Sequence, residues 1–175
     1  MTTSGRGGTS PLPGARSSPS ALERFNAAPA HLAEAVLHTC CRSRRWAERL
    51  AAHRPYPDRD ALLAAADEAS YDLSVGEVAA ALACEDSPGP GADTPQAALT
   101  ALRAAHAAYE SRFGHAFVIC LDACAPRERL DRILAEIRSR LGNEPDEERA
   151  VAADELRRLA RGRLARAVGA WPESG

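Results

Sequence analysis

From about residue 21 onward, apolar residues in this 175-residue chain recur at the spacing of amphipathic helices, and alanine dominates among them. Gly and Pro, which interrupt helices, gather in three short stretches, residues 54–57, 87–91 and 142–145. The pattern predicts helices over residues 29–41, 43–53, 58–69, 74–84, 94–113, 126–141 and 146–168. We therefore expect an all-α chain of a size that fits one domain.

Several of these helices begin at residues that can cap them. Ser43 and Asp58 each precede an apolar-periodic stretch and can accept a hydrogen bond from a free N–H of the first turn. Ser74 is followed three residues later by Glu77, which is the pattern of a capping box. The pair Thr94-Pro95 is interpreted as a cap followed by the first helical residue, where the missing proline N–H costs nothing.

One apolar run, residues 117–121 (FVICL), has the composition of a β-strand. The sequence contains no second run of comparable strength, so the backbone groups of a strand here would have no sheet partner. We therefore expect this run to be a buried helical or irregular core segment.

Charge and composition exclude several classes of protein. The 22 basic and 24 acidic residues give a net charge of −2 and form no long block of one sign, which argues against nucleic acid and anionic lipid as partners. No apolar run approaches the roughly 20 residues of a membrane span. The first twenty residues lack the apolar core of a secretory signal, so we expect a cytoplasmic protein. Because they are rich in Gly, Ser, Pro and Thr, we expect residues 1–20 to form a disordered tail before a single helical domain over 21–170.

The cysteines indicate neither a zinc knuckle nor a disulfide framework, because their number is odd and no CxxC pair occurs. We interpret them as buried thiols in a reducing compartment. They are Cys40, Cys41, Cys84, Cys120 and Cys124.

A series of short motifs, each weak alone, gains meaning from its order. The series is Phe25-Asn26, Cys41-x-Ser43-x-x-Trp46, Arg54-Pro55-Tyr56, the 63–67 helix, Leu73-Ser74 with Glu77 and Ala81-Leu82, Tyr109-x-x-Arg112-Phe113-Gly114-x-x-Phe117, Arg140-Leu141-x-Asn143, Glu148, and Glu155 to Leu164. In this order and spacing, residues 25 to 165 resemble the 2-oxo-4-hydroxy-4-carboxy-5-ureidoimidazoline (OHCU) decarboxylase family, which completes the oxidation of urate to allantoin.

The resemblance implies an all-α, single-domain bundle of about seven to nine helices, a homodimer, and no metal or organic cofactor. The implied substrate is a small anionic imidazoline that bears a carboxylate and a ureido group. The implied chemistry is loss of carbon dioxide followed by protonation of the resulting carbanion-like carbon on one face, which gives S-allantoin. Such a site needs cationic and N–H donors for the anion and a positioned acid or base.

At the position of the family's catalytic acid this chain differs. Family members place a His-Pro pair after the helix that here ends at Cys84, and Glu85 stands where the histidine would be. A glutamate has a reference pKa of about 4.3, so Glu85 could act as an acid only if burial raised its pKa by roughly 2 units. The alternative is that Glu85 is a solvated loop charge.

Two further candidates come from the same resemblance. The family has a Glu-Gln pair at a helix start, where this chain has Pro95-Gln96. Helical spacing turns Gln96 inward at a terminus that can bind an anion, although a glutamine here can also bond the backbone near the cap. His115 matches a position often polar in the family and precedes the run expected to line the pocket. His106, on an inward stripe, is more simply a packed core histidine.

Arg163 is at the position of the arginine that grips the substrate in family members. At 100° per residue it lies within about 40° of Leu156 and Leu159, on the apolar face of its helix. A guanidinium on that face needs an anion, which is either a ligand or an internal carboxylate. A further departure is the loop of residues 122–126, where the family tends to carry Gly-Arg-Ser.

Two functional hypotheses follow. In the first, the chain is an OHCU decarboxylase with a replaced acid, in which Glu85, Gln96 and Arg163 line an anion pocket. In the second, it is a catalytically degenerate paralogue that serves as a small-anion binding or protein-interaction scaffold. Positioned acid and base groups typically contribute about 10²–10⁴-fold to a rate, so we expect weak or absent turnover. A helical regulator of nucleic-acid binding is disfavoured because the charge is balanced.

Overall fold

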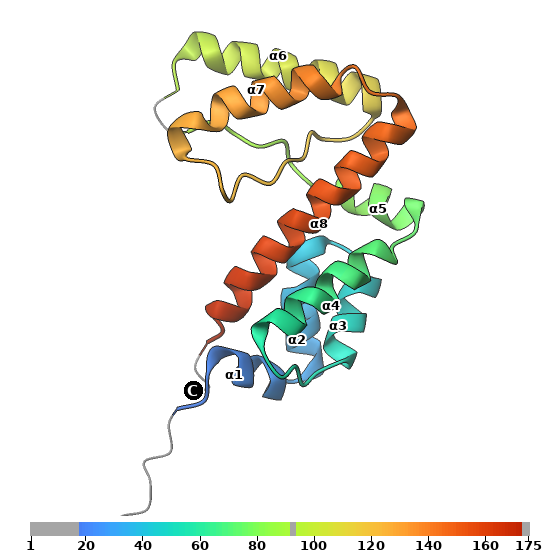
Figure 1. Ribbon diagram of the computed structural model, residues 1–175, viewed down its shortest axis with the longest axis vertical. Helices are drawn as coiled ribbons and strands as arrows, with labels where there is room; N and C mark the ends of the chain where they lie inside the picture. The colour runs from blue at the N-terminus through green and yellow to red at the C-terminus, as the bar shows by residue number, and fades with distance from the viewer. Residues whose placement is uncertain (1–17, 92–93, 173–175) are drawn as a thin grey trace, which may run out of the picture.

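The computed structural model describes residues 18–91 and 94–172 (Figure 1), which form eight α-helices, one 3₁₀-helix and irregular segments, with no β-strand in this part of the chain. The helices are α1 (Ala21–Ala27), α2 (Ala30–Cys41), α3 (Arg44–Ala52), α4 (Arg59–Tyr71), α5 (Val75–Leu82), α6 (Gln96–Phe113), η1 (Pro126–Glu128), α7 (Arg129–Arg140) and α8 (Pro145–Gly169). The all-α prediction is confirmed.

The longest helix, α8, runs through the molecule and joins two groups of helices (Figure 1). Its C-terminal half packs against α1, α2 and α4, while α6 and α7 lie side by side near its other end. The buried residues of α8 recur every four positions, at Glu148, Ala152, Leu156, Ala160, Leu164 and Val168. Because four residues advance about 40° past a full turn, the buried face winds about 200° around the axis from end to end. The same helix can therefore contribute buried residues to hydrophobic cores on different sides of its axis.

Three hydrophobic clusters result from this arrangement. The largest is formed mainly by α1 to α4 around Trp46 and receives Ala160, Leu164 and Val168 of α8. A second joins α6, the 117–121 segment and α7. A third, with Leu82 and Val118, receives Ala152 and Leu156. Trp46 and Tyr56 are buried as core anchors in the first cluster.

The predicted helices all form, but α1 was not among them. Its sequence signal is a capping box at Ser20: the Ser20 hydroxyl accepts from the Glu23 N–H, and the Glu23 carboxylate accepts from the Ser20 N–H. The helix is only seven residues long and ends before Pro29, so its apolar periodicity is too short to detect. Phe25, fully buried, fixes it against the first cluster.

Three of the four predicted helix starts are confirmed. Ser43 accepts from the Trp46 N–H, Asp58 accepts from the Ala61 N–H, and Ser74 forms the capping box with Glu77. The interpretation of Thr94-Pro95 was wrong by one residue. Pro95 has an extended ψ of 146° and is itself the cap position, so α6 begins at Gln96. The Thr94 hydroxyl instead donates to the Gly91 carbonyl at 2.8 Å.

The 117–121 segment is irregular and deeply buried at Phe117, Val118 and Ile119, as predicted. Side chains of other elements form hydrogen bonds with three of its backbone groups. The Ser87 hydroxyl accepts from the Phe117 N–H at 3.0 Å, and Arg140 of α7 donates to the Val118 carbonyl at 2.8 Å. The Glu155 carboxylate of α8 accepts from the Cys120 N–H at 2.7 Å.

Arg140 also belongs to a buried polar cluster at the start of α8. Arg140 is 4% exposed and Glu148 is not exposed at all, and the Arg140 Nε donates to Glu148 at 2.9 Å. The hydroxyl of Tyr109 and the amide of Asn143 also donate to Glu148. Burial raises the pKa of Tyr109, so its hydroxyl stays a donor. A fully satisfied buried pair of this kind fixes α6, α7 and α8 relative to one another.

No helix among the described residues combines the length and the apolar character needed to span a bilayer. Residues 1–17, most of the segment expected to be a disordered tail, lie outside the described residues. The division into this tail and a 21–170 domain stays a prediction.

We predict that Glu148→Gln lowers the free energy of unfolding by about 3–5 kcal/mol, because it leaves the Arg140 charge buried without a partner. Denaturant unfolding followed by circular dichroism measures the change. The control is Glu48→Gln, which removes the partner of the exposed Arg44 and should leave the unfolding midpoint in place. A loss smaller than about 1 kcal/mol for Glu148→Gln would show that the cluster does not hold these helices together.

Candidate functional site

Arg163 of α8 and Glu85 form a two-point ion pair. The Arg163 NH1 donates to the Glu85 Oε1 at 2.6 Å, and its NH2 donates to the Oε2 at 2.6 Å. The Glu85 side chain is only 5% exposed and that of Arg163 is 32% exposed. The interpretation of Glu85 as a solvated loop charge was therefore wrong. Of the two partners considered for Arg163, the structure shows the internal carboxylate.

The local chain explains why Glu85 reaches Arg163. After α5 ends at Leu82, the chain makes a further tight turn in which the Glu85 N–H donates to the Leu82 carbonyl at 3.1 Å. Arg163 also donates to the Cys40 carbonyl at the end of α2, at 3.2 Å. The hydrogen bonds that Arg163 donates to Glu85 raise the pKa of Arg163, which therefore stays charged. Glu85 accepts through both oxygens, which is the bonding of a carboxylate and not of a proton donor.

A second carboxylate reaches α8 three residues further on. Asp122, in the loop that follows the 117–121 segment, accepts from Arg166 at 2.9 Å. Its Oδ2 lies 2.2 Å from the place that a Cβ of residue 162 would occupy, so Gly162 provides the space into which Asp122 fits. Two loops thus meet the same stretch of α8, and each places a carboxylate on an arginine.

Gln96 does not join this site. It lies in the first turn of α6 and is exposed, and no hydrogen bond connects it with Arg163 among the described residues. The expectation that it faces inward was wrong, because the buried part of α6 begins later, at Leu102, and extends to Tyr109.

His115 lies in a different place from Arg163. It is half-buried, its Nδ1 donates to the Ala116 carbonyl at 2.9 Å, and its ring meets the edge of Tyr109. It lines a cavity of about 240 Å³ between the ends of α5 and α6 and the start of α8, and neither Glu85 nor Arg163 lines that cavity. The structure therefore brings together two of the four predicted site residues, Glu85 and Arg163.

His106 is a packed histidine, as predicted. Its ring stacks on Phe117 with centroids 6.1 Å apart, and burial lowers its pKa. Among the described residues its Nε2 has no hydrogen-bond partner. This favours the neutral ring.

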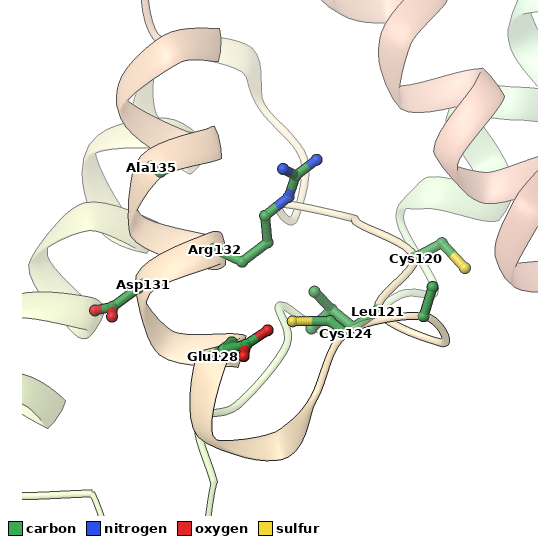
Figure 2. A pocket seen from close by; sticks show the side chains of 8 residues that line it. Cys120, Leu121, Cys124, Glu128, Asp131, Arg132 and Ala135 are labelled. Carbon is green, nitrogen blue, oxygen red and sulfur yellow. The ribbon is translucent and has the colours of Figure 1, made fainter.

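A larger cavity, of about 550 Å³, lies between α7 and the loop that carries Cys120 and Cys124 (Figure 2). Figure 2 shows Arg132 extending from α7 and the Cys124 sulfur directed toward Glu128, while the Cys120 sulfur is directed away from α7. The charged side chains that line this cavity are of both signs, and Arg132 is paired with Glu136 at 2.9 Å. None of the predicted site residues lines this cavity.

The cysteines are free, as predicted, but they are not all buried. Cys40 and Cys41 are buried, Cys120 and Cys124 are partly exposed, and Cys84 is exposed because it lies in the turn after α5. Among residues 18–91 and 94–172, no group of three or more His, Cys, Asp or Glu side chains is placed to hold a metal ion.

The sequence model of the OHCU decarboxylase family matches residues 26–93 and 85–165. The chain belongs to the OHCU decarboxylase family. A 2-oxo-4-hydroxy-4-carboxy-5-ureidoimidazoline decarboxylase of Amia calva is 40% identical in an alignment 77 residues long, which covers 39% of this chain and 42% of that protein. The chain therefore spans about two fifths of the length of this curated relative.

Two solved structures share the fold. A crystal structure of (S)-allantoin synthase has a TM-score of 0.65 and 18% identity, over 81% of this chain and 51% of that one. A crystal structure of OHCU decarboxylase in the presence of (S)-allantoin has a TM-score of 0.64 and 21% identity, over 75% of this chain and 95% of that one. At these identities the likeness shows a common helical architecture.

The two parts of the family match overlap at residues 85–93, and the first residue of this overlap is Glu85, in the loop that follows α5. The same loop contains Ser87, whose hydroxyl bonds both the Phe117 N–H and the Glu110 carboxylate. Sequence reasoning missed Ser87, Asp122 and Gly162 as residues that shape this region. Gly162 carried a signal, because glycine in the middle of a long helix costs about 1 kcal/mol and so indicates a packing reason.

We predict that Cys84 reacts first and Cys41 last when the folded protein is treated with iodoacetamide at pH 8. Burial, together with the nearby negative charge of Glu85, raises the pKa of Cys41 to about 12, so at pH 8 this thiol stays protonated. Burial also raises the pKa of Cys40. Peptide mass spectrometry over time measures the order. In denaturant all five thiols should react together, and equal rates for Cys41 and Cys84 in the folded protein would contradict the packing at Glu85.

Proposed function

We propose that the protein binds the carboxylated ureidoimidazoline of the family reaction at Arg163 and decarboxylates it to S-allantoin in urate catabolism, with weak or absent turnover. Family membership supports the reaction. The single observation that supports weak or absent turnover is the two-point ion pair of Arg163 with Glu85. The same resemblance supports a homodimer that works without a metal or organic cofactor, and the free thiols support a cytoplasmic location.

Arg163 is suited to hold a carboxylate, because a guanidinium matches its two oxygens with two parallel N–H groups. Glu85 already makes this pair of bonds. A substrate carboxylate must therefore displace a carboxylate that is part of the same chain. A tethered competitor has an effective concentration in the millimolar range or above, so the substrate gains little from replacing it.

The second requirement is a proton. When the C–C bond to the carboxylate breaks, carbon dioxide leaves, the electron pair remains on the ring carbon, and an acid must protonate that carbon on one face. Glu85 is the one carboxylate bound to Arg163 in the described part of the chain, and it is bound as an acceptor. Without a positioned acid the reaction loses about 10²–10⁴-fold, which supports weak turnover.

The pair also favours a second candidate function. If Glu85 never leaves Arg163, the chain is a catalytically degenerate scaffold that binds small anions or a protein partner elsewhere.

The test uses freshly generated substrate and follows the optical activity of the allantoin formed, because spontaneous decay gives a racemate. We expect at most a small excess of one enantiomer from the parent chain and none from Arg163→Gln. Glu85→His frees Arg163 and places an imidazole beside it, so we expect stereoselective turnover to rise, by up to about 10²–10⁴-fold if the imidazole delivers the proton.

The matched control is Asp72→Asn, which removes the carboxylate of the Arg49 pair at the end of α4 and should leave turnover unchanged. High stereoselective activity in the parent, lost in Glu85→Gln, would assign the proton transfer to Glu85 and overturn weak turnover. A racemate from the parent and from Glu85→His alike would favour the scaffold.

A further inference from the structure

Two neighbouring cavities lie along α5 and the start of α8 and contain neither Glu85 nor Arg163. The first, of about 240 Å³, is the cavity that His115 lines. The second, of about 280 Å³, lies between the start of α5 and α8. Arg149 lines both of them. We call the first the basic cavity and the second the apolar cavity.

The basic cavity is surrounded by positive and protonatable groups. Arg112, His115 and Arg149 line it, and no carboxylate does. Arg112 is held in place, because its NH2 donates to the Asn143 carbonyl at 2.9 Å and its guanidinium lies over the Phe113 ring. Leu82 and Phe113 add an apolar surface. Such a combination suits one anionic group attached to an apolar body.

A carboxylate is the anion that the structure already shows at this place. Arg149 is paired with Asp146, a neighbour one turn earlier in α8 whose side chain is 92% exposed. Because an exposed pair three residues apart contributes little free energy, a ligand carboxylate can replace Asp146 at small cost. Arg112 has N–H groups left for the same ligand after its single bond to Asn143.

The apolar cavity can receive the rest of such a ligand. Leu73, Val75 and Val78 form one wall, and Ala150 and Ala153 of α8 form the other; Asp146 and Arg149 of α8 also line this cavity. Val75 is 64% exposed. Covering it would remove apolar surface from water.

We propose that these two cavities form a second binding site, which takes a small monocarboxylate with an aromatic or branched aliphatic body. The carboxylate lies between Arg112 and Arg149, and the body lies against Val75 and Val78. The occupant is a free small molecule, because each cavity is smaller than the pockets of drug-sized ligands and the two share one cation. The site does not depend on the proposed decarboxylation at Arg163.

Isothermal titration calorimetry with 4-phenylbutyrate tests the site, and 4-phenylbutan-1-ol serves as its uncharged counterpart. We expect saturable one-to-one binding of the acid and at least about tenfold weaker binding of the alcohol. Arg112→Gln and Arg149→Gln should each weaken the binding of the acid by about tenfold. Val75→Asp should weaken it as well, because it places a charge in the apolar wall. All three positions are exposed, so thermal unfolding should show intact folds.

Two controls separate this site from other causes. Arg138→Gln changes an exposed arginine of α7 outside both cavities and should keep the parental Kd. Arg163→Gln should also keep it. Equal binding of acid and alcohol, an equal loss in Arg138→Gln, or loss of binding in Arg163→Gln would each overturn the proposal. So would sedimentation showing that a second copy of the chain covers Val75 and excludes the probe.

Discussion

The winding buried face of α8 is the constraint on which the architecture depends. Buried residues at four-residue intervals advance about 40° per step, so Glu148 and Val168, at the two ends of the face, point in nearly opposite directions. The same helix can therefore close the cluster around Trp46 and the cluster around Val118. Its first buried position holds a charge and not an aliphatic group, and that charge is matched by Arg140.

Because α8 passes both groups of helices, its side chains can bind the segments that connect the other helices, and no β-sheet is needed to hold these segments. Glu155 holds the Cys120 N–H, Arg163 holds Glu85 and Arg166 holds Asp122. The strand-like 117–121 segment is the clearest consequence, since charged side chains from α7 and α8 replace the strand partner that it lacks. Charge-assisted hydrogen bonds are stronger than the neutral bonds of a β-ladder, which explains how a lone irregular run remains buried.

Most of the fold follows from the sequence, whereas for the candidate site the sequence indicates only that Arg163 lies on an apolar face and needs an anion. Helical spacing and cap residues such as Ser74 are local features, so they can be recognised in a single sequence. The short α1 and the cap of α6 were misjudged because seven residues give no periodicity and because Thr94 bonds Gly91 instead of the helix. The Glu85–Arg163 pair joins residues 78 positions apart, and only the folded chain shows which of the open partners an inward arginine has found.

The contacts that hold Glu85 in place limit what else can bind to Arg163. Glu85 and Ser87 belong to the same loop, and the Ser87 hydroxyl is bonded at once to the Phe117 N–H and to Glu110. Glu85 is thus restrained both by the turn after Leu82 and by the anchor at Ser87. Moving it away from Arg163 exposes a buried carboxylate to water but leaves the arginine without an anion, so the exchange is favourable only when a ligand supplies one. Arg163 therefore has a sufficient structural reason to be an arginine even without a substrate, and its presence alone does not require turnover.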